Sequence, residues 1–251
     1  MRLLEPLTPD PRAPLAKAHP LAKIAAALIC MLALFLTIDP ITPTLVLLAE
    51  VGVVPLIGVP PRALLRRALP VFVAAIGIGF FNAVVSRDIG GGVAIGIRLV
   101  GIALAGIVAI ASIDPTELAD ALVEHLHAPP RFTVGALAVF RLLPLFADEW
   151  QTIALARRAR GIENTGPLAR VTAFFPMTRS LLVAAIRRAT RLAIAMDGRG
   201  FADAGSPCRT LARPRPILAR DWWLIAASLA IATLASAASV AAGTWRFFLA
   251  R

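Results

Sequence analysis

One stretch decides the class of this protein: residues 93–113 read VAIGIRLVGIALAGIVAIASI, with Arg98 as their one charged residue. Crossing the apolar part of a bilayer takes about 20 such residues, within a range of roughly 17–25. Four further apolar runs are of comparable length, at residues 21–38, 44–59, 69–86 and 222–243. We therefore predict an all-α integral membrane protein with about five transmembrane helices.

The composition of the whole chain agrees with this class. Of its 251 residues, 58% are hydrophobic and 16% are charged, and the mean hydropathy is +0.78. An average soluble domain has about 25% charged residues. So much apolar surface has no place inside a water-soluble fold of this size, which disfavours a soluble enzyme. The same hydrophobicity excludes intrinsic disorder.

The apolar runs divide the chain into four expected parts. These are an N-terminal segment (1–20), a four-helix transmembrane region (21–113), a charged helical region (114–221), and a last transmembrane helix with a tail (222–251). The first part together with Lys23, the link between the second and third spans, and region 114–221 hold 22 of the 26 Lys and Arg residues. Five spans place these segments on one side, and cytoplasmic sides carry the excess of Lys and Arg. We expect a multi-pass protein of the cell membrane with its N-terminus in the cytoplasm.

Region 114–221 is predicted to contain three amphipathic helices. The first begins at Asp114-Pro115, a helix-start pattern, and stops at Pro129-Pro130. The second runs over 132–160 with Pro144 inside it, and the third over 177–199. The first has an apolar face of leucines and another face with Glu117, Asp120 and Glu124, while the other two have an apolar and a basic face. Such helices suit a position along the membrane boundary.

The second and third of these helices end alike, at Ala159-Arg160-Gly161 and at Gly198-Arg199-Gly200. A glycine after the last turn takes the left-handed conformation, and a cation there meets the negative end of the helix dipole. One such end is an ordinary helix stop. Two of them suggest a pair of contacts for a partner, because a guanidinium binds carboxylates in a bidentate manner.

Motifs for chemistry within this chain are absent from the sequence. It has no GxxxxGK[ST] phosphate loop, and no HExxH, GxSxG or CxxC. We therefore expect no catalytic residues, no bound cofactor and no metal site. Glu50 and Arg98 lie inside predicted spans, where a charge costs at least about 2.5 kcal/mol. We expect them to form an ion pair at matching depth.

With its two arginine endings 39 residues apart, the sequence resembles the transmembrane T component of energy-coupling factor (ECF) transporters, the EcfT/CbiQ/BioN family. The Asp114-Pro-Thr-Glu-Leu helix start, the stretch from Arg141 to Pro144 and the order of spans add to the likeness. It covers about residues 19–243. The chain differs from the family at Gly198, where alanine is usual, and at Arg157, where glutamine is frequent.

The resemblance implies a coupling subunit of an importer for vitamins or transition metals. Arg160 and Arg199 would dock on two cytoplasmic ATPase subunits, which bind the ATP and Mg²⁺. The amphipathic helices would hold a membrane S component that binds the substrate, and Arg141, Pro144 and Arg157 become candidates for hinge or coupling roles. No nucleic acid partner is expected. Two other classes stay open: an integral membrane enzyme of lipid metabolism, which would cluster Asp or His near the interface, and a stand-alone secondary carrier, which would place polar residues in the spans.

Overall fold

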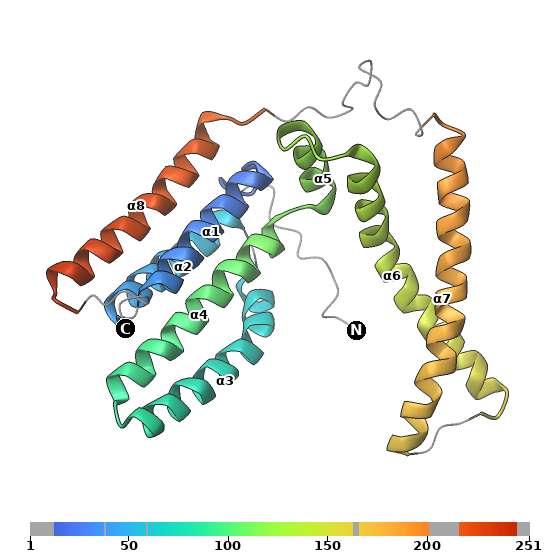
Figure 1. Cartoon of the computed structure of the whole chain (residues 1–251), viewed down its shortest axis with the longest axis horizontal. Helices are drawn as coiled ribbons and strands as arrows, with labels where there is room; N and C mark the ends of the chain where they lie inside the picture. The colour runs from blue at the N-terminus through green and yellow to red at the C-terminus, as the bar shows by residue number, and fades with distance from the viewer. Residues whose placement is uncertain (1–12, 38, 59, 163–165, 201–215, 245–251) are drawn as a thin grey trace. The chain divides into compact units, whose positions relative to one another are not determined.

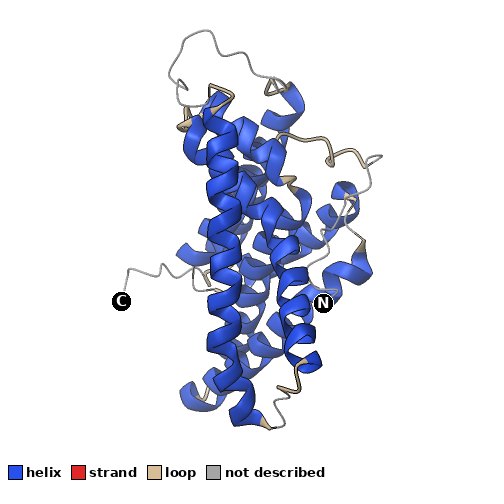
Figure 2. Cartoon of the chain, turned by 90° about the vertical axis from the view of Figure 1, so that its right-hand side faces the viewer, coloured by secondary structure: helices blue, strands red, loops and turns tan. Residues whose placement is uncertain are grey.

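The structure, a computed structural model, describes residues 13–37, 39–58, 60–162, 166–200 and 216–244. The regular elements of these residues are all α-helices (Figure 2). The chain divides into two compact units, which are described separately. The first contains residues 1–118 and 215–251, and the second contains residues 119–214.

The first unit is a bundle of apolar helices. Its helices are α1 (Pro20–Leu36), α2 (Ile41–Ile57), α3 (Pro61–Ser86), α4 (Ile89–Ser112) and α8 (Ala219–Ala241). Helix α4 packs against α1, α2 and α3, while α8 packs against α1 and α2. Figure 1 shows α3 and α4 side by side as a hairpin. The bundle is thus built around α4, the stretch that indicated the class of the protein.

Three of these helices, α3, α4 and α8, are long and apolar enough to cross a membrane. Helices α1 and α2 are also apolar but have 17 residues each, about 25 Å at 1.5 Å per residue. Helix α3 starts at Pro61, eight residues before the predicted apolar run at 69–86. The prediction followed hydropathy alone, whereas the helix also includes residues 61–68, which carry three arginines. Large side chains along it, such as Val73, Ile76 and Phe80, are 65–72% exposed, as suits a lipid-facing surface.

Helices α3 and α4 approach closely because glycine stands at their contact. A Cβ atom added at Gly92 would lie 2.5 Å from the Cβ of Ala83 and 2.6 Å from the carbonyl oxygen of Gly79. A Cβ added at Gly79 would in turn lie 2.9 Å from the carbonyl oxygen of Gly92. Small residues allow such approach between helices in lipid, where packing rather than hydrophobicity holds them together.

We expect Gly92→Ala to lower stability by about 2 kcal/mol, because the added methyl group meets backbone atoms that cannot move aside. The matched control is Gly106→Ala in the same helix, where a Cβ meets nothing within 4 Å. Alanine has the higher helix propensity, so the control should be neutral or stabilising. Thermal unfolding of the full chain in detergent measures both, and equal midpoints would contradict the close contact.

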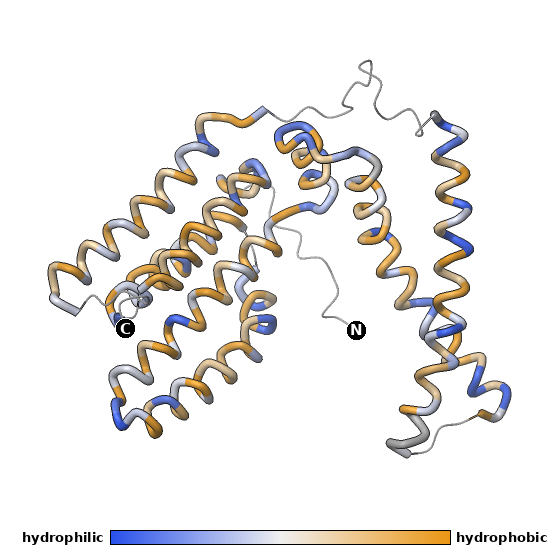
Figure 3. The backbone as a smooth tube through the Cα atoms, viewed as in Figure 1, coloured by the Kyte–Doolittle hydropathy of each residue, from blue (hydrophilic) through white to orange (hydrophobic). Residues whose placement is uncertain are grey.

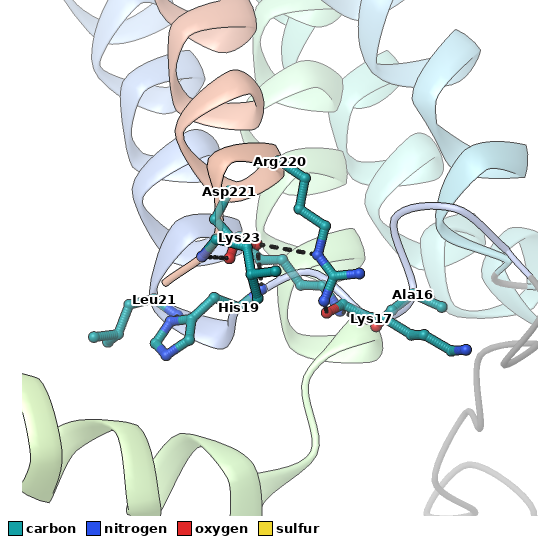
Figure 4. A network of polar contacts seen from close by, with 8 residues as sticks. Ala16, Lys17, His19, Leu21, Lys23, Arg220 and Asp221 are labelled. Atoms are coloured by element: carbon teal, nitrogen blue, oxygen red, sulfur yellow. Dashed lines mark hydrogen bonds and ion pairs between the residues drawn. The ribbon is translucent and has the colours of Figure 1, made fainter. Parts of the chain in front are cut away.

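A buried carboxylate joins the beginnings of α1 and α8 (Figure 4). Asp221, which is fully buried, accepts hydrogen bonds from the backbone N–H of His19 at 2.7 Å and from that of Leu218 at 2.8 Å. His19 is the N-cap of α1 and Leu218 the N-cap of α8. One side chain therefore caps its own helix and satisfies a donor at the start of a helix 202 residues away.

Two cations complete this network. The Lys23 ammonium donates to the carbonyls of Ala16 and Ser112, each at 2.8 Å. Ser112 is the last residue of α4, and a cation there interacts favourably with the negative end of that helix. The Arg220 guanidinium donates to the carbonyl of Lys17 at 2.6 Å. The network thus ties α1, α4 and α8 together at one end of the bundle.

Replacement of Asp221 by alanine leaves two backbone donors unsatisfied, and we expect a loss of about 2 kcal/mol or more. Asp88→Ala is the control, because Asp88 is the N-cap of α4 but makes no side-chain capping bond. Its effect should stay within about 0.5 kcal/mol. Unfolding midpoints of the two variants test the network, which a similar loss in both would contradict.

The second unit contains two long helices, α6 (Pro130–Ala159) and α7 (Pro167–Asp197), which pack against each other. The short helix α5 (Pro115–His125) begins in the first unit and ends in the second. Hydrophilic and hydrophobic residues alternate along α7, whereas α1 is mostly hydrophobic (Figure 3). The predicted start of the third amphipathic helix at residue 177 is wrong by ten residues, because the helix continues through Pro176 to an N-terminal Pro167.

Candidate functional site: the ends of α6 and α7

Helix α6 ends in a closed hydrogen-bonded turn. Arg160 is its C-cap, and Gly161 follows with φ of +72°. The N–H of Gly161 donates to the carbonyl of Arg158 at 2.9 Å, and the N–H of Ile162 donates to that of Arg157 at 3.1 Å. These two bonds make a Schellman motif. The backbone of the turn is therefore fixed, and the Arg160 side chain, which is exposed, projects from a rigid base.

Helix α7 is also followed by a left-handed glycine, although its C-cap is Gly198. Gly200 has φ of +73°, and its N–H donates to the carbonyl of Asp197 at 2.9 Å. Arg199 therefore stands immediately before a left-handed glycine, as Arg160 does, and is also exposed. The left-handed glycines that the sequence predicted at both ends are confirmed. We call these two ends, Arg160-Gly161 and Arg199-Gly200, the arginine tips.

The residue before the second tip, Gly198, has ordinary right-handed geometry with φ of −63°. A Cβ atom there would lie 3.5 Å from the carbonyl oxygen of Ile194, an ordinary van der Waals contact. Alanine would therefore fit at this position. The backbone at residue 198 therefore does not require glycine, although this glycine is a point at which the sequence differs from the family that it resembles.

The arginine tips lie toward opposite ends of α7. The second tip follows the last residue of α7, while the first precedes Pro167 by seven positions. In Figure 1, α6 and α7 cross, and α6 ends at the end of the pair at which α7 begins. Helix α7 has 31 residues, which corresponds to a length of about 46 Å. The two tips therefore offer two separate points of contact rather than one.

The other predicted coupling residues lie along α6. Arg141 and Pro144 are exposed, and Pro144 is inside the helix. Arg157 is partly buried and lines a cavity between α6 and α7. No pattern in the sequence indicates this cavity, because its walls come from two helices whose contact is set by tertiary packing.

Glu50 and Arg98 do not form the predicted ion pair in this structure. Arg98 donates to the backbone carbonyl of Phe35 at the end of α1. Both carboxylate oxygens of Glu50 are buried and have no hydrogen-bond partner among the described residues. They face a cavity of about 120 Å³ lined by α1, α2, α4 and α8. The prediction failed because equal positions along two helices do not place their side chains on facing sides.

We expect Gly161→Ala to loosen the end of α6, because an L side chain in the left-handed region costs about 1–2 kcal/mol. Amide hydrogen exchange should quicken over residues 157–162 and stay unchanged in the rest of α6. Gly135→Ala is the control within the same helix, since a Cβ there meets nothing within 4 Å. If the two variants exchange alike at residues 157–162, the turn does not depend on glycine.

Comparison with known proteins agrees with the arrangement described above. Residues 11–207 match the family CbiQ, described as "Cobalt transport protein". Three relatives are each named energy-coupling factor transporter transmembrane protein EcfT. The one from Staphylococcus aureus (strain 04-02981) is 35% identical over 120 residues, which is 44% of each chain. The one from Limosilactobacillus fermentum is 37% identical over 114 residues, 41% of this chain and 42% of the relative.

The third relative, from Bacillus subtilis (strain 168), is 31% identical over 166 residues, or 62% of each chain. The chain thus spans less than two thirds of the length of each of these relatives. The family match is much longer, since it covers most of the first unit's apolar helices, all of α6 and α7 and both arginine tips. This multi-pass membrane protein therefore belongs to the CbiQ/EcfT family of transmembrane components of energy-coupling factor transporters.

Proposed function

We propose that this chain is the coupling subunit of an importer, which transmits motion from two cytoplasmic ATPase subunits to a membrane S component. The observation that carries this proposal is the pair of arginine tips. Both have an exposed arginine immediately before a left-handed glycine, and they lie toward opposite ends of a helix about 46 Å long. Two similar subunits side by side need two such contacts at a fixed distance.

In this proposal each guanidinium binds carboxylates in a groove of one ATPase subunit. ATP and Mg²⁺ bind to those subunits, not to this chain. When the ATPase pair closes on ATP, the two tips are displaced relative to each other. Because α6 and α7 pack against each other, a displacement of their ends tilts the whole pair.

The S component would rest on the apolar side of the same helices. Large exposed side chains occur along both, among them Phe140 and Leu143 of α6 and Leu182 and Ile186 of α7, each 53–58% exposed. Exposed apolar surface of this extent marks an interaction site or a lipid contact. The solute, a vitamin or a transition metal, would be bound by the S component. The N-terminus and both tips would be cytoplasmic, as the Lys and Arg distribution indicates.

Replacing both tip arginines, in the double variant R160A/R199A, tests this proposal. We expect cognate ATPase subunits, co-expressed with the chain and purified in mild detergent, to be lost from the double variant and reduced in each single one. Truncating one partner of an interface charge pair typically costs about 2–5 kcal/mol. R187A/R191A is the control, since it removes two exposed arginines from within α7 and should retain the subunits.

Two outcomes would contradict the proposal. One is full retention of the ATPase subunits by R160A/R199A. The other is solute uptake into vesicles that contain this chain alone, which would favour a secondary carrier. Glu50, whose carboxylate has no hydrogen-bond partner among the described residues and lines a cavity between the bundle helices, would then be the first residue to replace.

A further inference from the structure

An ion pair and a ring contact join α6 to α7, and both start from consecutive residues of α6. Oε2 of Glu149 lies 2.7 Å from Nη2 of Arg188. The ring of the next residue, Trp150, lies 5.6 Å from that of Phe174, at an angle of 53°. Phe174 and Arg188 are 14 residues apart on α7, which corresponds to about 21 Å. One position of α6 therefore holds α7 at two separate places.

Two separate contacts restrict how the helices can turn against each other. Helices α6 and α7 cross (Figure 1), and Met177, which lies between the two contacts in the sequence, is buried. Aromatic rings attract each other over a range of roughly 4.5–7 Å between centroids. A charge-assisted hydrogen bond needs a distance of about 2.7–2.9 Å. The ion pair therefore fixes the crossing angle more narrowly than the ring contact does.

The ion pair is partly protected from water. The side chains of Arg188 and Glu149 are 33% and 27% exposed, and within them Nη1 of Arg188 and Oε2 of Glu149 are buried. Salt screens partly buried charges less than fully exposed ones. Removal of either partner leaves the other charge partly buried without its counter-ion, which is unfavourable. The pair is therefore suited to hold α7 in one orientation.

The ion pair has the same spacing to both arginine tips. Glu149 precedes Arg160 by 11 residues, and Arg188 precedes Arg199 by 11 residues. Each of these helical arms is about 16 Å long, so that a change of about 20° in the crossing angle moves a tip by roughly 5 Å. The contact that fixes the crossing angle therefore also fixes the distance between the tips.

We propose that the Glu149–Arg188 ion pair is a positioning element that sets the distance between the arginine tips before any partner binds. This inference rests on the proposed function, in which two ATPase subunits require contacts at a fixed distance. A preformed distance lowers the entropic cost of docking, because α6 and α7 need not be ordered against each other when the subunits bind. Glu149 and Arg188 act on docking through the tips.

The test measures the distance between the tips in the full chain, in detergent and without ATPase subunits. Cys30 and Cys208 are first replaced by serine, so that spin labels attach at R160C and R199C alone. Double electron–electron resonance then gives the distribution of distances between the two labels. We expect one narrow distribution, because the ion pair holds a single crossing angle.

Charge reversal and charge exchange separate the ion pair from a merely structural role. E149R and R188E each bring like charges together, and we expect the distance to shift or its distribution to broaden by about 5 Å. The exchange E149R/R188E restores opposite charges and should restore the narrow distribution. D148R/R187E is the control, since it reverses the two neighbouring charges, which are exposed, and it should change nothing.

An unchanged distribution in E149R and R188E, or no restoration by the exchange, would overturn the proposal. If circular dichroism shows that a reversal lowers the helix content, E149Q and R188Q are measured instead. We then expect a smaller broadening, no greater in the double variant than in either single one, and additive effects would refute the pair. No ATPase subunit is present, so full retention of those subunits by R160A/R199A would refute the docking and leave the distance result standing.

Discussion

The first unit depends on one buried carboxylate. Asp221 holds the beginnings of α1 and α8 together by accepting from the backbone of each, although the two helices lie at opposite ends of the sequence. The second unit, with both of its long helices, lies in the sequence between α1 and α8, the two helices that Asp221 joins. A carboxylate suits this place because two helix N-termini meet there, and each favours negative charge. The adjoining Lys23 performs the complementary task at the C-terminal end of α4.

Much of this architecture could be predicted from local patterns. Apolar runs located the helices of the bundle, since little else in a sequence produces 20 residues with one charge. The left-handed glycines at 161 and 200 followed from the same kind of local rule, because a helix end is determined within a few residues. The start of α7 could not be predicted in this way. Proline weakens a helix without always ending it, and α7 continues through Pro176 where it packs against α6.

Contacts between distant helices were beyond sequence reasoning. Glu50 and Arg98 lie at matching depth in their spans, yet the rotation of each helix about its axis decides which side chains face one another. The close approach at Gly79 and Gly92 was missed for a similar reason, because small residues are frequent throughout the spans. Gly101 and Ala105 pack inside the bundle: a Cβ at Gly101 would lie 2.9 Å from Leu34, and Ala105 is 6% exposed.

The length of α7 has a mechanical consequence. A helix of about 46 Å that is held at one end acts as a lever, so a rotation of only about 5° sweeps its far end through roughly 4 Å. Movements of that size equal the thickness of a single side-chain layer. A small rotation of the partner that holds one end of α7 is thereby converted into a larger displacement of the other end, without breaking a hydrogen bond inside the helix.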